Sequence, residues 1–150
     1  MCDYPELGAM IAYCGHLGKQ SLDQLLRRAG YDVTPTQTHL LMHLSCADEG
    51  QEATQRDLEH KLRLKPSTVN GIVDRLEAKG YVSRRTSPQD GRVRLVCLTD
   101  AGRSKVQDFH AIVEETERRF TAGLSGQERE QLKALLYRII ENLENEVNSV

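Results

Sequence analysis

The stretch that decides the fold is residues 66–98, PSTVNGIVDRLEAKGYVSRRTSPQDGRVRLVCL. Its apolar residues recur at 69, 72, 73 and 76, the i, i+3, i+4, i+7 spacing of one helical face. The opposite face carries short polar side chains, and Gly80 follows, as glycine often does just past a helix C-terminus. The pattern therefore predicts an amphipathic helix over 66–79 with a buried apolar face and an exposed polar face.

A basic hairpin is predicted directly after this helix. Two strand-like runs, 81–85 and 93–98, flank a turn-rich segment, 87–92, that contains an Asp-Gly pair. The hairpin carries arginines at 84, 85, 92 and 94. A helix with a polar outer face fits the DNA major groove, and an arginine-tipped loop can reach a neighbouring minor groove. The two elements together favour a reader of duplex DNA.

A second short helix is predicted upstream. Thr54 to Asp57 begin it, Leu62 ends it, and residues 63–65 form the turn before Pro66. Two short helices joined by such a turn make a helix-turn-helix, here over about 54–79, with a wing at 80–98. A further helix is expected to start at the capping box of Thr34 and Gln37, so that the DNA-binding part spans about 34–98. Residues 48–52 are expected to be a polar loop.

The charge is distributed unevenly along the chain. Residues 56–94 hold ten Lys or Arg against five acidic residues, a net charge of +5, whereas the whole chain carries −2. A basic segment on an acidic scaffold is typical of a local DNA-binding surface. The alternative is an ordinary solvated charged surface.

The composition bounds the class of protein. With 150 residues, 39% hydrophobic and 28% charged, the sequence predicts one globular domain, 1–150. It has no apolar run near the roughly 20 residues of a membrane span, and its acidic start lacks a signal-peptide pattern, so we expect no membrane partner and a cytoplasmic location. It also lacks the usual catalytic and cofactor motifs, so we expect neither an enzyme nor a bound cofactor.

Three flanking helices exceed what a DNA reader requires. They are expected at about 7–29, from 99 to about 122, and from the capping box of Ser125 and Glu128 to about 148. Each carries an apolar stripe, which suggests dimerisation. A two-fold dimer would place two recognition helices about 34 Å apart, one turn of DNA.

Several short motifs resemble the MarR family of bacterial regulators. They are the helix motif Lys65-Pro66-Ser67-Thr68-Val69-Asn70, the wing motif Asp90-Gly91-Arg92, and Leu98-Thr99-x-x-Gly102. The resemblance covers essentially the whole chain. It implies a mainly α fold with a small β-hairpin: a winged helix-turn-helix core with N- and C-terminal dimerisation helices. It also implies a homodimer on pseudo-palindromic promoter DNA, usually a repressor that a small ligand, an oxidant or a metal releases.

The resemblance implies which residues contact DNA. Arg92 resembles the wing arginine that enters the minor groove, and Asp90 its partner in holding the loop. Ser67, Thr68, Asn70 and Arg75 occupy base- and phosphate-facing positions, and Arg84, Arg85 and Arg94 are expected near the DNA backbone. The full set of predicted contacts is Thr54, Gln55, Lys65, Pro66, Ser67, Thr68, Asn70, Arg75, Arg84, Arg85, Asp90, Arg92 and Arg94.

The releasing signal stays open between three hypotheses. A small organic ligand is one, with Tyr13, His16, His39, Met42 and His43 as candidate lining residues. Thiol sensing at Cys14 is the second, although the default for Cys14, Cys46 and Cys97 is a buried cysteine acting as a small hydrophobe. The third is a metal held by His39 and His43, for which the sequence shows neither a third ligand nor a C-x-x-C pair, so no metal site is expected. A different class, a winged helix used only for protein contacts, would not need the basic hairpin.

Overall fold

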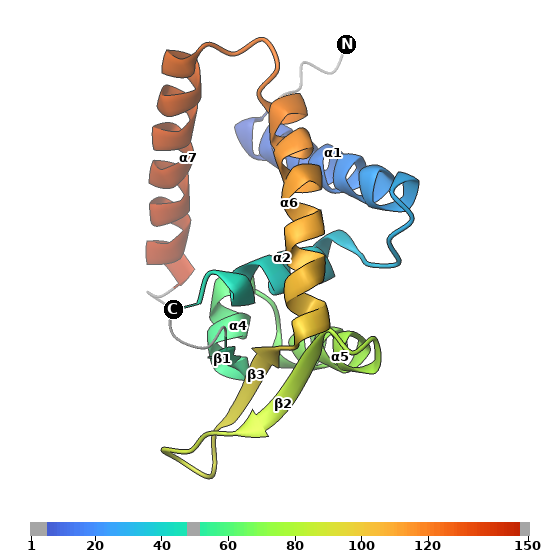
Figure 1. Ribbon diagram of the computed structural model, residues 1–150. Helices are drawn as coiled ribbons and strands as arrows, with labels where there is room; N and C mark the ends of the chain where they lie inside the picture. The colour runs from blue at the N-terminus through green and yellow to red at the C-terminus, as the bar shows by residue number, and fades with distance from the viewer. Residues whose placement is uncertain (1–5, 48–51, 148–150) are drawn as a thin grey trace. The chain divides into compact units, whose positions relative to one another are not determined.

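The computed structural model describes residues 6–47 and 52–147, which form helices and one small sheet (Figure 1). The helices are α1 (Leu7–Arg28), α2 (Pro35–Ser45), α4 (Gln55–Leu62), α5 (Pro66–Ala78), α6 (Asp100–Phe120) and α7 (Gly126–Val147). The strands are β1 (Glu52–Thr54), β2 (Val82–Thr86) and β3 (Arg94–Leu98). The chain divides into two compact units, one up to Thr116 and one from Glu117 onwards. The predicted helical fold with a β-hairpin is confirmed.

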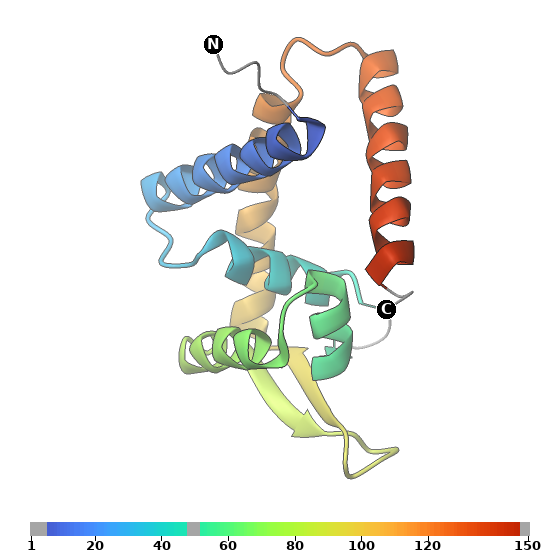
Figure 2. The ribbon, with the colours of Figure 1, turned by 180° about the vertical axis from the view of Figure 1, so that it is seen from behind.

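The sheet is antiparallel with strand order β1-β3-β2. The hairpin pairs Val82 with Leu98 and Thr86 with Arg94, and its closed end extends beyond α4 and α5 in both views (Figures 1 and 2). The predicted loop at 48–52 was wrong at its end, because Glu52 begins β1 and pairs with Cys97. Three residues are too few to show strand alternation, and β1 exists only through its pairing with β3. Residues 48–51 lie outside the described residues.

The core of the first unit lies beneath α5. Val69, Ile72, Val73 and Leu76 are all buried, which confirms the predicted apolar face. They pack in one cluster with apolar residues from every other helix of this unit and from β2 and β3. The remaining buried members are Leu22, Leu26, Val33, Leu40, Leu41, Leu44, Leu58, Val82, Val96, Leu98, Val106 and Phe109.

Capping boxes fix the helix starts that the sequence predicted. The Thr34 hydroxyl accepts from the Gln37 backbone N–H at 3.2 Å, while the Gln37 side chain accepts from the Thr34 N–H at 3.0 Å. Ser125 and Glu128 make the corresponding exchange before α7. Each exchange satisfies two backbone N–H groups that a helix N-terminus leaves unpaired.

One joint links the recognition helix, the wing and α6. The Thr99 N–H donates to the Tyr81 carbonyl at 3.1 Å, and the Thr99 hydroxyl donates to the Gly80 carbonyl at 2.6 Å. The same hydroxyl accepts from the Gly102 N–H at 3.0 Å. A Cβ on Gly102 would lie only 2.0 Å from the Tyr81 carbonyl oxygen. The Leu-Thr-x-x-Gly motif is therefore explained by a hydroxyl that bridges two backbones and a glycine that permits their close approach.

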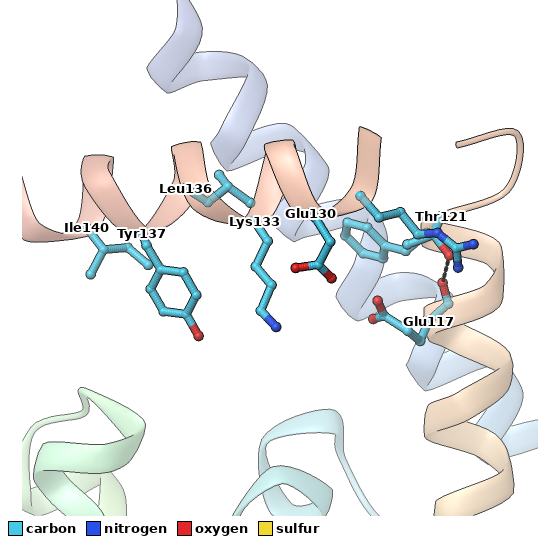
Figure 3. Close-up of a pocket in the computed structure, with 9 residues that line it drawn as sticks. Glu117, Thr121, Glu130, Lys133, Leu136, Tyr137 and Ile140 are labelled. Carbon is cyan, nitrogen blue, oxygen red and sulfur yellow. Dashed lines mark hydrogen bonds between the residues drawn. The ribbon is translucent and has the colours of Figure 1, made fainter. Parts of the chain in front are cut away.

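The second unit contains the last turn of α6 and helix α7. None of the residues of α7 is buried, although Leu132, Leu135, Ile140, Leu143 and Val147 follow a helical spacing. A groove of about 580 Å³ lies between the end of α6 and α7, with Leu136, Tyr137 and Ile140 on one side and Glu117 and Thr121 on the other (Figure 3). Within the second unit, the described residues therefore leave the apolar stripe of α7 exposed.

The burial predicted for the cysteines is wrong for two of them. Cys14 and Cys46 are exposed, and only Cys97 is buried. Cys14 lies in the N-terminal half of α1, where the described chain buries no residue before Leu22, and Cys46 caps the C-terminus of α2. Helical spacing therefore predicted burial correctly only on those helix faces that a neighbouring element covers. Cys2 lies outside the described residues.

Candidate nucleic-acid interface

The outer face of α5 is polar and exposed. Pro66 starts the helix, and Ser67, Thr68, Asn70 and Arg75 are all exposed on the side opposite the buried cluster. Lys65 precedes the helix without a side-chain capping bond. A helix with one buried face and short exposed polar side chains on the other can enter a major groove and reach base edges.

The wing tip is closed by backbone bonds around Asp90. The Asp90 carboxylate accepts from the Arg92 backbone N–H at 2.9 Å, and the Asp90 carbonyl accepts from the Val93 N–H at 3.0 Å. The side chains of Arg92 and Arg94 are exposed. Asp90 thus shapes the loop through the backbone of Arg92, which leaves the guanidinium to project from the tip.

The first helix of the helix-turn-helix is held by Thr54 and Asp57. The Asp57 carboxylate accepts from the Thr54 N–H at 3.0 Å and from its hydroxyl at 2.6 Å. These bonds, together with nearby basic side chains, hold the pKa of Asp57 below its ordinary value despite partial burial. Gln55 is also engaged, because its amide donates to Glu59 at 3.3 Å. Both residues predicted to contact DNA here have partners inside the protein.

The two arginines of β2 form ion pairs within the protein. Arg84 lies 2.6 Å from both Asp74 and Glu77 of α5. Burial would lower the pKa of Arg84, but the bonds to Asp74 and Glu77 outweigh it and raise the pKa. Arg85 pairs with Glu52, which raises the pKa of Arg85 and lowers that of the carboxyl, and its Nε lies 3.3 Å from the Cys97 sulfur. Burial raises the pKa of the Cys97 thiol, which therefore stays protonated at neutral pH.

The end of α5 is tied to the segment between α1 and α2. The Lys79 ammonium lies 2.8 Å from the Asp32 carboxylate and also contacts the Asp32 carbonyl. The hydrogen bond and the charge of Lys79 lower the pKa of Asp32. A cavity of about 620 Å³ adjoins this pair and is bounded by Arg27 of α1, Gln37 of α2 and Arg75 of α5.

The five predicted ligand residues do not line this cavity. Tyr13, His16, His39, Met42 and His43 lie on α1 and α2, and the cavity instead uses the C-terminal end of α1 and the N-terminal end of α2. Burial lowers the pKa of both histidines, with Lys19 adding to the effect at His39 and Lys61 at His43. Over residues 6–47 and 52–147, no three His, Cys, Asp or Glu side chains are grouped to hold a metal ion.

This arrangement defines a winged-helix DNA-binding protein. Sequence comparisons place it further. The profile of the MarR family matches residues 31–93. The HTH-type transcriptional regulator YdgJ of Bacillus subtilis (strain 168) is 34% identical over 113 residues, covering 75% of this chain and 67% of that protein. The chain belongs to the MarR family and is a DNA-binding transcriptional regulator.

Solved structures agree with the assignment. The S. aureus MepR–DNA complex is 29% identical with a TM-score of 0.83, covering 93% of this chain and 99% of that one. A mutant of E. coli MarR in complex with operator DNA is 28% identical with a TM-score of 0.80, covering 89% of this chain and 92% of that one. Within the part of the chain that the structure describes, no helix has the length and apolar character to cross a membrane.

Proposed function

We propose that this chain acts as a homodimeric repressor that covers a promoter and is released by an effector. Helix α5 lies in the major groove with Ser67, Thr68 and Asn70 toward the bases, and Arg92 of the wing enters the adjacent minor groove. Phosphate contacts supply affinity and base contacts supply sequence choice. The MarR–operator and MepR–DNA complexes, whose folds are similar over most of this chain, support DNA as the partner.

The observation that carries the proposal is the division of α5 into two faces. Its apolar face is buried in the core, whereas Ser67, Thr68 and Asn70 are exposed on the opposite face, where they can meet a partner. The same end of the unit carries the exposed arginines of the wing. A protein-contact module would have no use for this pairing of a polar helix face with a basic tip.

The homodimer is supported by apolar surface that a single chain leaves exposed. On α7 the stripe runs from Leu132 to Val147, and on α1 it includes Leu7, Met10, Tyr13 and Leu17, all of which are exposed. Surfaces of this kind on helices mark contacts with another protein chain. A second copy is the most economical partner, because two-fold symmetry would present two recognition helices to a pseudo-palindromic site.

The effector is supported by the cavity beside the end of α5. A ligand there would touch Arg75 of the recognition helix, Lys79 at its C-terminal cap and Arg27 of α1. Because it would contact both helices, it could favour a state in which the recognition helices no longer match the groove spacing. The volume of about 620 Å³ lies within the roughly 300–1,000 Å³ of small-molecule sites.

The experiment that tests the proposal is fluorescence anisotropy over a salt series. The probes are the duplex upstream of the protein's own gene and a shuffled duplex of equal composition. Tight binding to the first alone, weakening steeply as salt rises, supports a sequence-specific regulator. Binding to neither duplex, or equal and salt-insensitive binding to both, would reject the proposed regulator in favour of a protein-contact module.

Two variants separate the roles assigned to the helix and the wing. Arg92→Ala should weaken binding to all sites with A/T-containing minor grooves. Asn70→Ala should instead alter which sequences are preferred, at about 1–3 kcal/mol for a lost base contact. Identical ranking of a panel of operator variants by wild type and Asn70→Ala would show that Asn70 is not a base reader.

A further inference from the structure

Arg84 of the wing makes contacts that the proposed function does not use. Its guanidinium lies against α5, where one nitrogen is 2.6 Å from Glu77 and the other is 2.6 Å from Asp74. The nitrogen that pairs with Asp74 also donates to the side-chain oxygen of Asn70 at 3.1 Å. In addition, the Arg84 backbone N–H donates to Glu77 at 3.1 Å. One wing residue thereby holds three residues of the recognition helix.

These contacts fix the side-chain amide of Asn70 from both ends. Its oxygen accepts from Arg84, and its nitrogen donates to the second oxygen of Asp74 at 3.1 Å. An asparagine amide can usually turn over about its last bond, which exchanges donor and acceptor. Here that turn would set the amide NH₂ group against a guanidinium and the amide oxygen against a carboxylate. The charges on either side therefore select one orientation.

Orientation matters because an amide recognises a base edge by the order of its donor and acceptor. The major groove offers a different order for each base pair, and asparagine reads adenine by using both groups together. After its contacts with Arg84 and Asp74, the Asn70 amide retains one N–H and one lone pair for a base. We propose that Arg84 is a positioning residue that fixes the donor–acceptor order of Asn70 and thus sets the base pair that α5 prefers. The inference rests on the proposed function, in which Asn70 reads a base.

A direct phosphate contact is the competing role for Arg84. The Arg84 side chain is only 21% exposed and already faces two carboxylates. A phosphate would have to compete with both for the same donors. Arg92 and Arg94, in contrast, are exposed at the wing and suit a phosphate or a groove without any rearrangement.

Arg84→Lys distinguishes the two roles. Lysine keeps the positive charge but offers a single nitrogen, which cannot bridge Asp74, Glu77 and Asn70 as a planar guanidinium does. Binding is measured on single base-pair variants of the best duplex selected from a randomised library. We expect Arg84→Lys to change the preference by about tenfold, at the same base pair that Asn70→Ala affects. We expect the salt dependence of binding to stay unchanged.

Further variants make the test independent of any one substitution. Arg103→Lys is the matched control, because Arg103 pairs with Asp100 within α6, and its ranking of sites should equal that of wild type. Asp74→Ala removes the acceptor on the other side of the Asn70 amide and should shift preference at the same base pair. In the double variant Asn70→Ala/Arg84→Lys, the second change should add nothing to the altered ranking.

Three results would overturn the positioning role. They are an unaltered ranking in both Arg84→Lys and Asp74→Ala, an unaltered ranking in Asn70→Ala, or additive changes in the double variant. Each leaves the proposed function standing if wild type still separates the selected duplex from its shuffled control. Loss of that separation in wild type would remove the proposed function itself, and the positioning role with it.

Discussion

The first unit and helix α7 use similar apolar stripes in opposite ways. In α5 the residues Val69, Ile72, Val73 and Leu76 are covered by their own chain, whereas α7 buries none of its residues. Both stripes have the spacing of an amphipathic helix, so spacing alone does not distinguish them. The DNA-binding unit therefore buries its own core, whereas α7 leaves its apolar stripe exposed.

The largest difference is expected when the same leucine-to-alanine substitution is made in the core of the first unit and on the exposed stripe of α7. Leu76→Ala leaves a cavity in the core and should lower the free energy of unfolding by about 2–5 kcal/mol. Leu143→Ala, at a site 57% exposed within one chain, should cost less than about 0.5 kcal/mol in dilute protein. Urea denaturation followed by circular dichroism measures both. Equal losses at low protein concentration would contradict the independence of the first unit.

Alanine substitutions at two glycines of the first unit should change the stability of the protein in opposite directions. Gly102→Ala forces a Cβ onto the Tyr81 carbonyl and should cost about 3 kcal/mol, at the upper end of overpacking. Gly71→Ala lies in open space within α5 and should stabilise the protein by about 0.5–1 kcal/mol through helix propensity. Thermal melting at fixed protein concentration compares them. A Gly102→Ala variant as stable as wild type would show that the backbone around Thr99 can move apart to accommodate a Cβ.

A charge on the stripe of α7 should act on association and leave the core intact. In the proposed homodimer, Leu143→Glu should raise the dissociation constant by about tenfold or more, because the contact would bury a carboxylate without a partner. Ala134→Glu puts the same charge on the opposite face of α7 and is the matched control. Sedimentation velocity over a concentration series measures association. A dimer unaffected by Leu143→Glu would place the contact on other helices.

The smallest effect concerns pH and the cap of α4. Since the pKa of Asp57 is lowered in the folded protein, its contribution is present at neutral pH and disappears as the pH falls through about 4 and below. Asp57→Asn should therefore lose about 0.5–1 kcal/mol at pH 7 and approach wild type as the pH falls below the lowered pKa of Asp57. Urea denaturation across this range checks the trend. A difference that stays constant with pH would show that the charge of Asp57 is not involved.

Much of the fold could be predicted from local chemistry. The capping boxes at Thr34, Thr54 and Ser125, the apolar spacing of α5 and the turn before Pro66 each define an element within a few residues. Strand β1 could not be predicted, because its three residues acquire their conformation from pairing with β3. The exposure of Cys14 likewise depends on what covers α1, which no pattern within α1 contains.

The candidate site shows the same limit at the level of single side chains. Exposed Ser67, Thr68 and Arg92 lie where the helix and turn patterns put them. The engagement of Arg84 by Asp74 and Glu77 depends on bringing β2 against α5, a contact between residues 7 and 10 positions apart that no spacing rule reports. Sequence reasoning therefore identified which residues face outward and missed which of them are already paired.

The joint at Thr99 has a mechanical consequence. A single hydroxyl accepts from the first turn of α6 and donates to the backbone just after α5, with Gly102 allowing the two to touch. Because one side chain makes both contacts, the start of α6 and the end of α5 are expected to move together as one rigid body. We therefore expect a tilt of α6 to move the end of the recognition helix with it. The rigidity of this contact would thus determine how far a displacement of α6 changes the position of α5 relative to the DNA major groove.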